Sequence, residues 1–148
     1  ALNLDPQQAD FAMTLARLQV EMGHNGDAVA TLKAAEPYAS GNPDFLAFMA
    51  VMLQRAGDDR AAITYFRNAL SIKQSVANWW LGLAISLEKT RQPEEALAAF
   101  RRAIAAGGLS PSLQAFADRR IAFLGRSSAE SETSAPPRGT GIMDGKLH

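Results

Sequence analysis

The sequence repeats itself at a fixed interval of 34 residues. Ala28, Ala62 and Ala96 recur at this spacing, and the same shift superposes other small and large apolar residues. The further matched sets are Ala35, Ala69 and Ala103; Leu32, Phe66 and Phe100; Leu15, Met49 and Leu83; and Phe11, Phe45 and Trp79. Each unit contains two stretches with helical apolar periodicity, which is typical of stacked helical hairpins. The spacing therefore predicts an all-α solenoid.

The turn within each unit has its own signal. Gly23 and Gly57 occupy equivalent positions, and Arg91 holds that position in the third unit. Glycine is favoured where a helix ends in a left-handed residue, so arginine there is expected to cost about 1 kcal/mol. Asp58 or Asp59 is then expected to cap the helix that follows Gly57.

The third unit resembles the tetratricopeptide repeat, whose pattern is W-x2-L-G-x2-Y, then A-x3-F, then A and P. The matching residues are Trp80, Leu83, Ala84, Leu87, Ala96, Phe100 and Ala103. The second unit matches with Leu46, Met49, Ala50, Leu53, Ala62, Phe66 and Ala69, and the first more weakly with Ala12, Leu15, Ala16, Gln19, Ala28, Leu32 and Ala35. The resemblance implies that the first helix of each hairpin lines a concave inner wall.

The same register divides the chain into segments. Residues 1–8 are expected to be the end of a truncated preceding repeat, which would make the chain a fragment of a longer protein. Three repeats are expected at 9–42, 43–76 and 77–110, followed by a capping helix at 111–125. Ser110 and Pro111 are a good N-cap and first residue for that helix. Residues 126–148 lack apolar periodicity and are expected to be a disordered tail or a remnant of an expression vector.

The first helix of each repeat has a second face, which is not expected to pack in the core of the hairpin. Asn78, Leu81, Ile85 and Glu88 lie on this face of the third unit. Their equivalents in the other units are Met13, Arg17 and Val20, and Ala47, Val51 and Gln54. An apolar strip with charged edges predicts a groove for a partner segment. Of the two tryptophans, Trp79 is expected to pack against the second helix of the preceding hairpin, and Trp80 within its own hairpin.

Composition excludes several classes of function. The chain has 15 basic and 15 acidic residues, which argues against binding of nucleic acid. It has no cysteine, and neither of its two histidines, His24 and His148, is combined with carboxylates in the spacing of a metal site. No apolar run approaches the ~20 residues that span a bilayer, so direct membrane insertion is not expected. No catalytic constellation is visible, and the sequence predicts a protein that is not an enzyme and uses no metal or cofactor.

A finer resemblance covers roughly residues 1–125 and is carried by two features, the stretch 79–88 followed by 93–110 and the final helix at 109–124. Together they are similar to the C-terminal region of biogenesis proteins of the mannose-sensitive haemagglutinin (type IV) pilus. That resemblance implies an assembly factor on the periplasmic side of the inner membrane. The alternative is a cytoplasmic repeat module that acts as a secretion-type chaperone or as the non-catalytic arm of a larger enzyme, such as a glycosyltransferase. Self-association through the N-terminal edge is a third hypothesis.

One subclass of the repeat family grips the C-terminal carboxylates of chaperones through lysine and asparagine on the inner wall. The matching positions here are Met13, Arg17, Phe48, Asn78 and Gly82. They depart from that pattern at nearly every place, so this kind of recognition is not expected.

Overall fold

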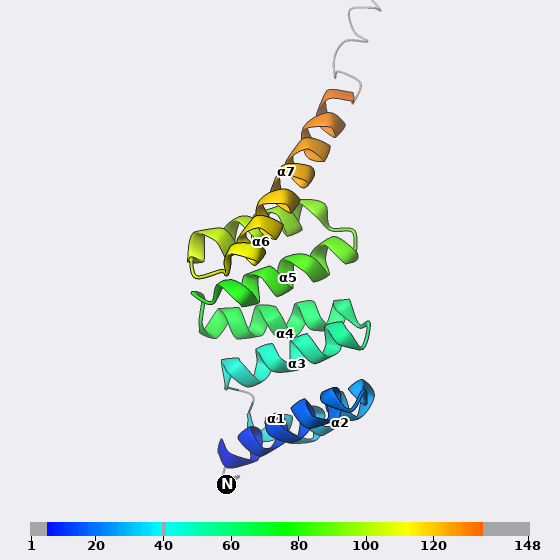
Figure 1. Ribbon diagram of the computed structural model, residues 1–148, viewed down its shortest axis with the longest axis vertical. Coiled ribbons are helices and arrows are strands. Elements are labelled where there is room, and N and C mark those ends of the chain that lie inside the picture. Colours follow the sequence, from blue (N-terminus) through cyan, green and yellow to red (C-terminus); the bar gives the residue numbers. More distant parts are fainter. Residues whose placement is uncertain (1–5, 40, 135–148) are drawn as a thin grey trace, which may run out of the picture.

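The structure is a computed structural model that describes residues 6–39 and 41–134 (Figure 1). These residues form seven α-helices and one short 3-10 helix, with no β-strand in the described ranges. The elements are α1 (Pro6–Glu21), α2 (Asn25–Ala35), η1 (Glu36–Tyr38), α3 (Pro43–Arg55), α4 (Asp59–Ile72), α5 (Ala77–Lys89), α6 (Pro93–Ala106) and α7 (Pro111–Ser134).

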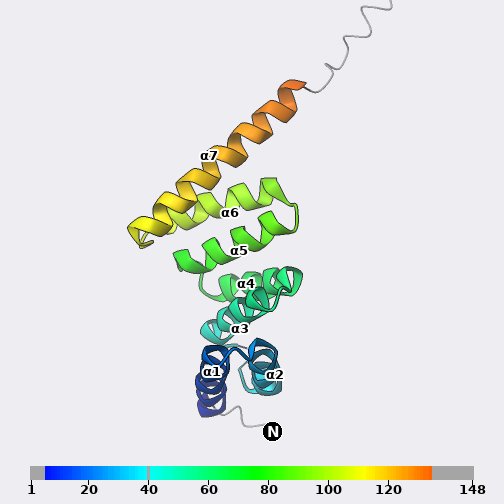
Figure 2. The ribbon, with the colours of Figure 1, turned by 45° about the vertical axis from the view of Figure 1, so that its right-hand side comes forward.

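The first six helices pair as three successive hairpins, α1–α2, α3–α4 and α5–α6. The hairpins stack in chain order along the long axis of the molecule, and α7 lies against α6 at the far end (Figures 1 and 2). Only neighbouring elements make extensive contacts, as in a quasi-one-dimensional repeat protein. The predicted all-α solenoid is confirmed.

Small residues let the helices approach one another. Ala28, Ala62 and Ala96, the first alanine series of the repeat, are completely buried. The aromatic residues Phe66 and Phe100, from the second helices, are also buried. Phe100 meets Phe116 of α7 edge to face, with ring centroids 6.0 Å apart. The core is therefore continuous from the first hairpin to α7.

Local sequence signals set the helix boundaries. Asn42 accepts hydrogen bonds from the backbone N–H groups of Asp44 and Phe45, and Asp58 accepts one from Ala61, which satisfies donors at the starts of α3 and α4. Of the two aspartates considered, Asp58 is thus the cap. Ser110 caps α7 in the same way, through the N–H of Leu113.

The left-handed turn position is occupied as the repeat predicts. Gly23 has φ 83°, Gly57 has φ 89°, and Arg91 has φ 63°. Arg91 is the only residue other than glycine with positive φ in the described ranges. Its Cβ is crowded in this conformation, whereas glycine adopts it freely.

Replacing Arg91 with glycine is expected to raise the free energy of unfolding by about 1 kcal/mol, because the strain disappears and the exposed side chain makes no buried contact. Urea denaturation measures the change. The converse substitution, Gly57→Arg at the equivalent position, is the matched control and is expected to lower stability by a similar amount. No gain in Arg91→Gly would contradict the strain argument.

Two boundaries differ from the sequence-based segments. Helix α7 runs to Ser134 rather than ending at 125, so residues 126–134 are helical where disorder was expected. Nothing between Gly125 and Ser134 breaks a helix: Gly125 does not have positive φ, and the first proline follows at 136. At the other end, α1 begins at Pro6, inside the segment 1–8 assigned to a preceding repeat. Residues 1–5 and 135–148 lie outside the described residues.

Candidate functional site

Three first helices converge on a shallow hollow in the inner wall, the face formed by α1, α3 and α5. Met13 comes from α1, Trp79 from α5, and the rest of the lining from α3. The full set, called the hollow below, is Met13, Asp44, Ala47, Phe48, Val51 and Trp79, around a volume of about 260 Å³. Met13, Phe48, Val51 and Trp79 are only partly buried, so their apolar surfaces reach solvent. The site can therefore take an apolar side chain from a ligand.

The structure separates the ten predicted groove residues into distinct environments. It brings Met13, Ala47 and Val51 together in the hollow. Leu81 is buried in the core and offers no surface, whereas Asn78 is exposed. Val20 and Ile85 are half-buried against the core cluster, and Arg17 is exposed. That these residues form a partner-binding groove stays a prediction.

The side chain of Gln54 hydrogen-bonds to the next repeat and is not free to bind a ligand. Its Nε2 donates to the carbonyl of Gly82 at 2.7 Å and to Ser86 Oγ at 2.8 Å. Ser86 is completely buried and in turn donates to Asp59 Oδ1 at 2.7 Å. This polar network joins α3, α4 and α5, so the side chain of Gln54 contributes to stacking of the second and third hairpins.

Glu88 is likewise occupied, at the end of the inner wall nearest α7. Two nitrogen atoms of the Arg120 guanidinium, on α7, each donate to one oxygen of the Glu88 carboxylate, with Nε 3.1 Å from Oε1. The Arg120 guanidinium also stacks over Phe123, 4.7 Å from the ring centroid. Bidentate pairing of this kind is geometrically specific and fixes α7 against α5.

The two tryptophans of α5 have different surroundings. Trp80 has neighbours in its own hairpin and in the preceding one: Arg102 of α6 stacks over its ring at 4.7 Å, and its Nε1 donates to the carbonyl of Gln74, which follows α4. Trp79 lines the hollow with residues of α3, instead of packing only on the preceding second helix. One turn further along α5, the ring of Phe66 from α4 lies against Gly82.

Phe48 and Trp79 line the hollow but are not among the ten predicted groove residues, although ligand stacking by Trp79 is the alternative to its structural role. Both side chains pack against the hydrophobic core. Periodicity assigned Trp79 to the interface between hairpins, because its equivalent in the second unit is Phe45, which is completely buried. The usable signal was size, because Trp79 is larger than Phe45, its equivalent in the second unit, and large aromatic residues are rarely fully buried.

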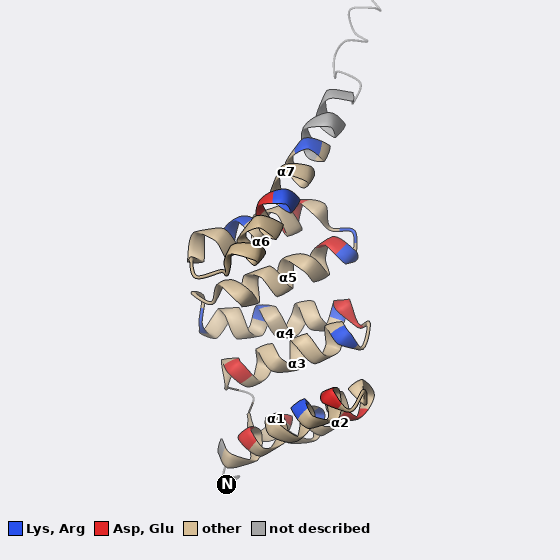
Figure 3. Ribbon diagram, in the orientation of Figure 1, with Lys and Arg blue, Asp and Glu red and all other residues tan. Residues whose placement is uncertain are grey.

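Charge is sparse at the hollow. Asp44 is its single ionisable lining residue and is exposed. Arg17 lies beside it but stacks over Phe48, 5.3 Å from the ring centroid. Elsewhere basic and acidic residues are interspersed along the solenoid (Figure 3).

Outside the inner wall, burial together with the hydrogen bond from its hydroxyl to Glu36 raises the pKa of Tyr65 to about 12. This bond joins η1 to α4.

Two further kinds of site were sought in the described residues. Within 6–39 and 41–134, no group of three or more His, Asp or Glu side chains is placed to hold a metal ion. Over the same part of the chain, no helix combines the length and apolar character needed to cross a membrane.

Stacked helical hairpins with an inner wall built from first helices define the chain as an α-solenoid repeat protein. Two tetratricopeptide-repeat family models match it, over residues 1–52 and 46–78. The chain therefore carries tetratricopeptide repeats, and α5–α6 continues the same hairpin geometry beyond them. No curated protein sequence matches it significantly.

Solved structures share the fold at low sequence identity. The type III secretion chaperone SycD of Yersinia enterocolitica, in complex with a peptide of the translocator YopD, is 15% identical with a TM-score of 0.73, covering 88% of this chain and 99% of that one. The first repeat domain of Spaghetti (RPAP3), bound to an HSP90 peptide, is 14% identical with a TM-score of 0.77, covering 87% and 99%. The Sgt2 domain of Aspergillus fumigatus is 18% identical with a TM-score of 0.72, covering 87% and 84%.

Proposed function

We propose that the protein is a non-catalytic scaffold that binds a peptide segment of a partner protein along its inner wall. The observation that carries the proposal is the hollow, where Phe48, Val51 and Trp79 are only partly buried and present apolar surface, with the Arg17 guanidinium over the Phe48 ring. Aromatic residues in such positions supply much of the binding energy at interfaces. SycD and the RPAP3 domain, which share this fold, were both solved with a bound peptide.

A random peptide library displayed on phage, selected on the immobilised protein, provides the probe. Binding of a selected peptide is then measured by fluorescence anisotropy. Val51→Asp places a charge in the hollow and Trp79→Ala removes its largest side chain, so each is expected to weaken binding at least about tenfold. Leu81 is unsuitable for this test, because a charge at that buried position would unfold the protein.

Thr64→Asp, on an exposed position of α4 away from the hollow, is the matched control and is expected to bind like the unmodified protein. Melting temperatures establish that all variants are folded. Failure to select any peptide, or equal binding by the hollow variants and Thr64→Asp, would remove the basis for this function.

The finer role that we propose is in pilus or envelope assembly. It is supported by the resemblance of residues 79–88, residues 93–110 and the final helix to pilus-biogenesis repeat proteins. The similarity to SycD favours the alternative of a secretion-type chaperone module. The sequence of the complete gene distinguishes these two roles from each other and from the alternative of a non-catalytic arm of a larger enzyme. A hydrophobic N-terminal segment supports the role in pilus or envelope assembly, and an appended catalytic domain supports the enzyme arm.

A further inference from the structure

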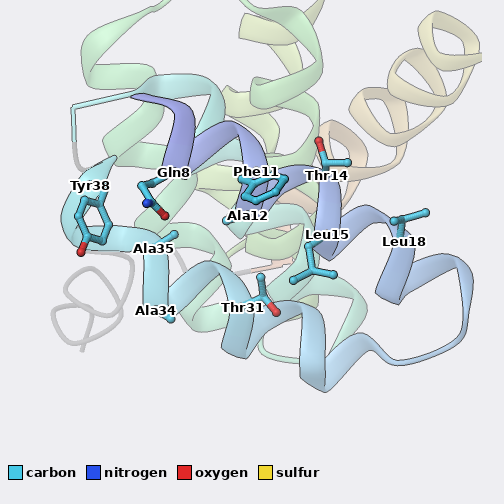
Figure 4. A pocket seen from close by; sticks show the side chains of 10 residues that line it. All are labelled: Gln8, Phe11, Ala12, Thr14, Leu15, Leu18, Thr31, Ala34, Ala35 and Tyr38. Carbon is cyan, nitrogen blue, oxygen red and sulfur yellow. The ribbon is translucent and has the colours of Figure 1, made fainter. Parts of the chain in front are cut away.

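Cavities outside the inner wall occur at different levels of the stack. One of about 400 Å³ follows α1 and α2, and none of its described lining residues is charged (Figure 4). Phe11 in its lining is equivalent to Phe45, which is completely buried in the core, so this surface is one on which repeat hairpins stack. Another, of about 440 Å³, lies within the stack along α4, α5 and α6 and has charged residues in its lining. It is called the α4–α6 cavity below.

The α4–α6 cavity has an apolar floor and a polar rim. The floor residues, each at most 4% exposed, are Leu70, Leu83, Leu87 and Ala99, and Trp80 beside them is partly buried. The exposed rim residues are Arg67, Ser71, Gln74, Glu95, Ala98 and Arg102. A cavity of this volume, with an apolar lining and a few polar groups, is typical of a site for a small molecule.

The α4–α6 cavity lies where the preceding pair of hairpins has a tyrosine side chain. Tyr65 of α4 reaches η1, where its hydroxyl donates to Glu36 Oε2 at 2.8 Å. One repeat later the equivalent residues are Ala99 and Leu70, and both line the cavity. These shorter side chains do not form such a bridge, so the space that a phenol ring crosses at one level is open at the next. The cavity therefore has room for an aromatic ring beside Ala99.

Arg102 supplies a positive charge next to that space. It lies one turn after Ala99 on the same side of α6, with its guanidinium 4.7 Å from the ring centroid of Trp80. Within the described residues, no carboxylate pairs with Arg102. Glu95, the acidic residue among the described lining residues, lies about 10 Å away along α6 and pairs with Arg67 at 2.5 Å. The uncompensated charge of the cavity is therefore positive.

We propose that the α4–α6 cavity binds a small molecule that carries an aromatic ring and a carboxylate about 5 Å apart, the spacing of one helical turn. The ring lies over Ala99, on the apolar floor, and the carboxylate accepts hydrogen bonds from Arg102. A guanidinium suits this role because it can donate two parallel hydrogen bonds to a carboxylate. The inference concerns a different surface from the proposed peptide site, and either can fail without the other.

The probe is 3-phenylpropionate, in which a short flexible linker joins the ring to the carboxylate. Its binding to the full chain is followed by NMR through the indole N–H signals of the two tryptophans. Trp80 lines the α4–α6 cavity and Trp79 lines the hollow, so only the Trp80 signal is expected to shift. The shift should saturate with a Kd of roughly 1 mM or lower. Trp79→Phe, which introduces the phenylalanine of the other two repeats, assigns the signals.

Arg102→Gln separates the effect of charge from that of the ring. It is expected to weaken binding of 3-phenylpropionate at least about fivefold and to leave the weaker binding of the uncharged 3-phenylpropanamide unchanged. Arg101→Gln is the matched control, because Arg101 is also exposed on α6 but does not line the cavity. It should bind 3-phenylpropionate like the unmodified protein.

A second variant fills the cavity. Ala99→Tyr combined with Leu70→Glu rebuilds the pair that Tyr65 and Glu36 form one repeat earlier, and it should abolish the shift of the Trp80 signal. Melting temperatures establish which variants are folded. Because Arg102 is exposed, Arg102→Gln tests the proposal whether or not the filled variant folds.

Three results would overturn the proposal. The first is the absence of a saturable Trp80 shift up to about 10 mM 3-phenylpropionate, tenfold above the expected Kd. The second is equal binding by Arg102→Gln and Arg101→Gln. The third is a shift of the Trp79 signal in place of Trp80, which would locate the probe in the hollow.

Discussion

Replacing Phe66 with alanine is expected to lower the free energy of unfolding by about 4 kcal/mol, one of the largest effects available in this chain. Phe66 is buried between the second and third hairpins, with its ring against the backbone of α5 at Gly82. The cavity left by the ring cannot collapse easily, because alanine contacts already set the spacing of the flanking helices. Urea denaturation followed by tryptophan fluorescence reports directly on this interface, since Trp79 and Trp80 both lie on α5.

The same contact can be tested from the other side. Gly82→Ala is expected to cost about 1–2 kcal/mol, because overlap with Phe66 outweighs the gain of ~1 kcal/mol in helix propensity. In a Phe66→Leu background the overlap is relieved, and the same substitution is expected to be neutral or stabilising. Gly125→Ala on α7, where an added Cβ meets nothing within 4 Å, is the matched control and should show the propensity gain alone. Stabilisation by Gly82→Ala in the unmodified protein would contradict the close approach.

Periodicity was sufficient to predict the hairpins because each repeat buries the same positions for the same reason. Ala28, Ala62 and Ala96 had to be small wherever two helices touch, and all three are completely buried. The turn was predictable on similar grounds. A left-handed residue ends the first helix of every hairpin, so Arg91 was placed by register even though it is not glycine.

The ends of the stack were less predictable, since no repeating partner constrains them. The helix after Pro111 was expected to stop at 125 because apolar periodicity stops there. It continues to Ser134, through a stretch that contains no proline and no glycine of positive φ. Phe11 illustrates the opposite end: its equivalent Phe45 is fully buried, but no helix in the described residues covers Phe11.

That the inner wall binds a partner stays a prediction, but the structure shows surroundings of its residues that a helical wheel does not. A helical wheel places Gln54 and Glu88 on the solvent face of their helices, and only the three-dimensional arrangement shows that Gly82, Ser86 and Arg120 engage them. The hollow depends on side chains from three helices that lie about 34 residues apart in the chain. A single-helix pattern cannot specify which of several half-buried residues remain open after such stacking.

Ser86→Ala is expected to lower the free energy of unfolding by about 2 kcal/mol, although it removes a single oxygen atom. Ser86 is the only buried polar residue in the described core. Its Oγ donates to Asp59 and accepts from Gln54, so its loss leaves a carboxylate and an amide short of a partner in a partly buried site. Leaving such groups unpaired typically costs ~1–3 kcal/mol.

The control for this prediction is Ser71→Ala. Ser71 is exposed and its hydroxyl bonds only to the carbonyl of Asn68 in its own helix, so its loss should change stability by less than ~0.5 kcal/mol. A double-mutant cycle with Gln54→Leu extends the test. If the three helices are held by one network, the double variant should be more stable than the two separate losses predict, because Gln54→Leu removes one of the groups that Ser86→Ala leaves unpaired. Equal effects of Ser86→Ala and Ser71→Ala would show that the network contributes nothing to the stacking of the second and third hairpins.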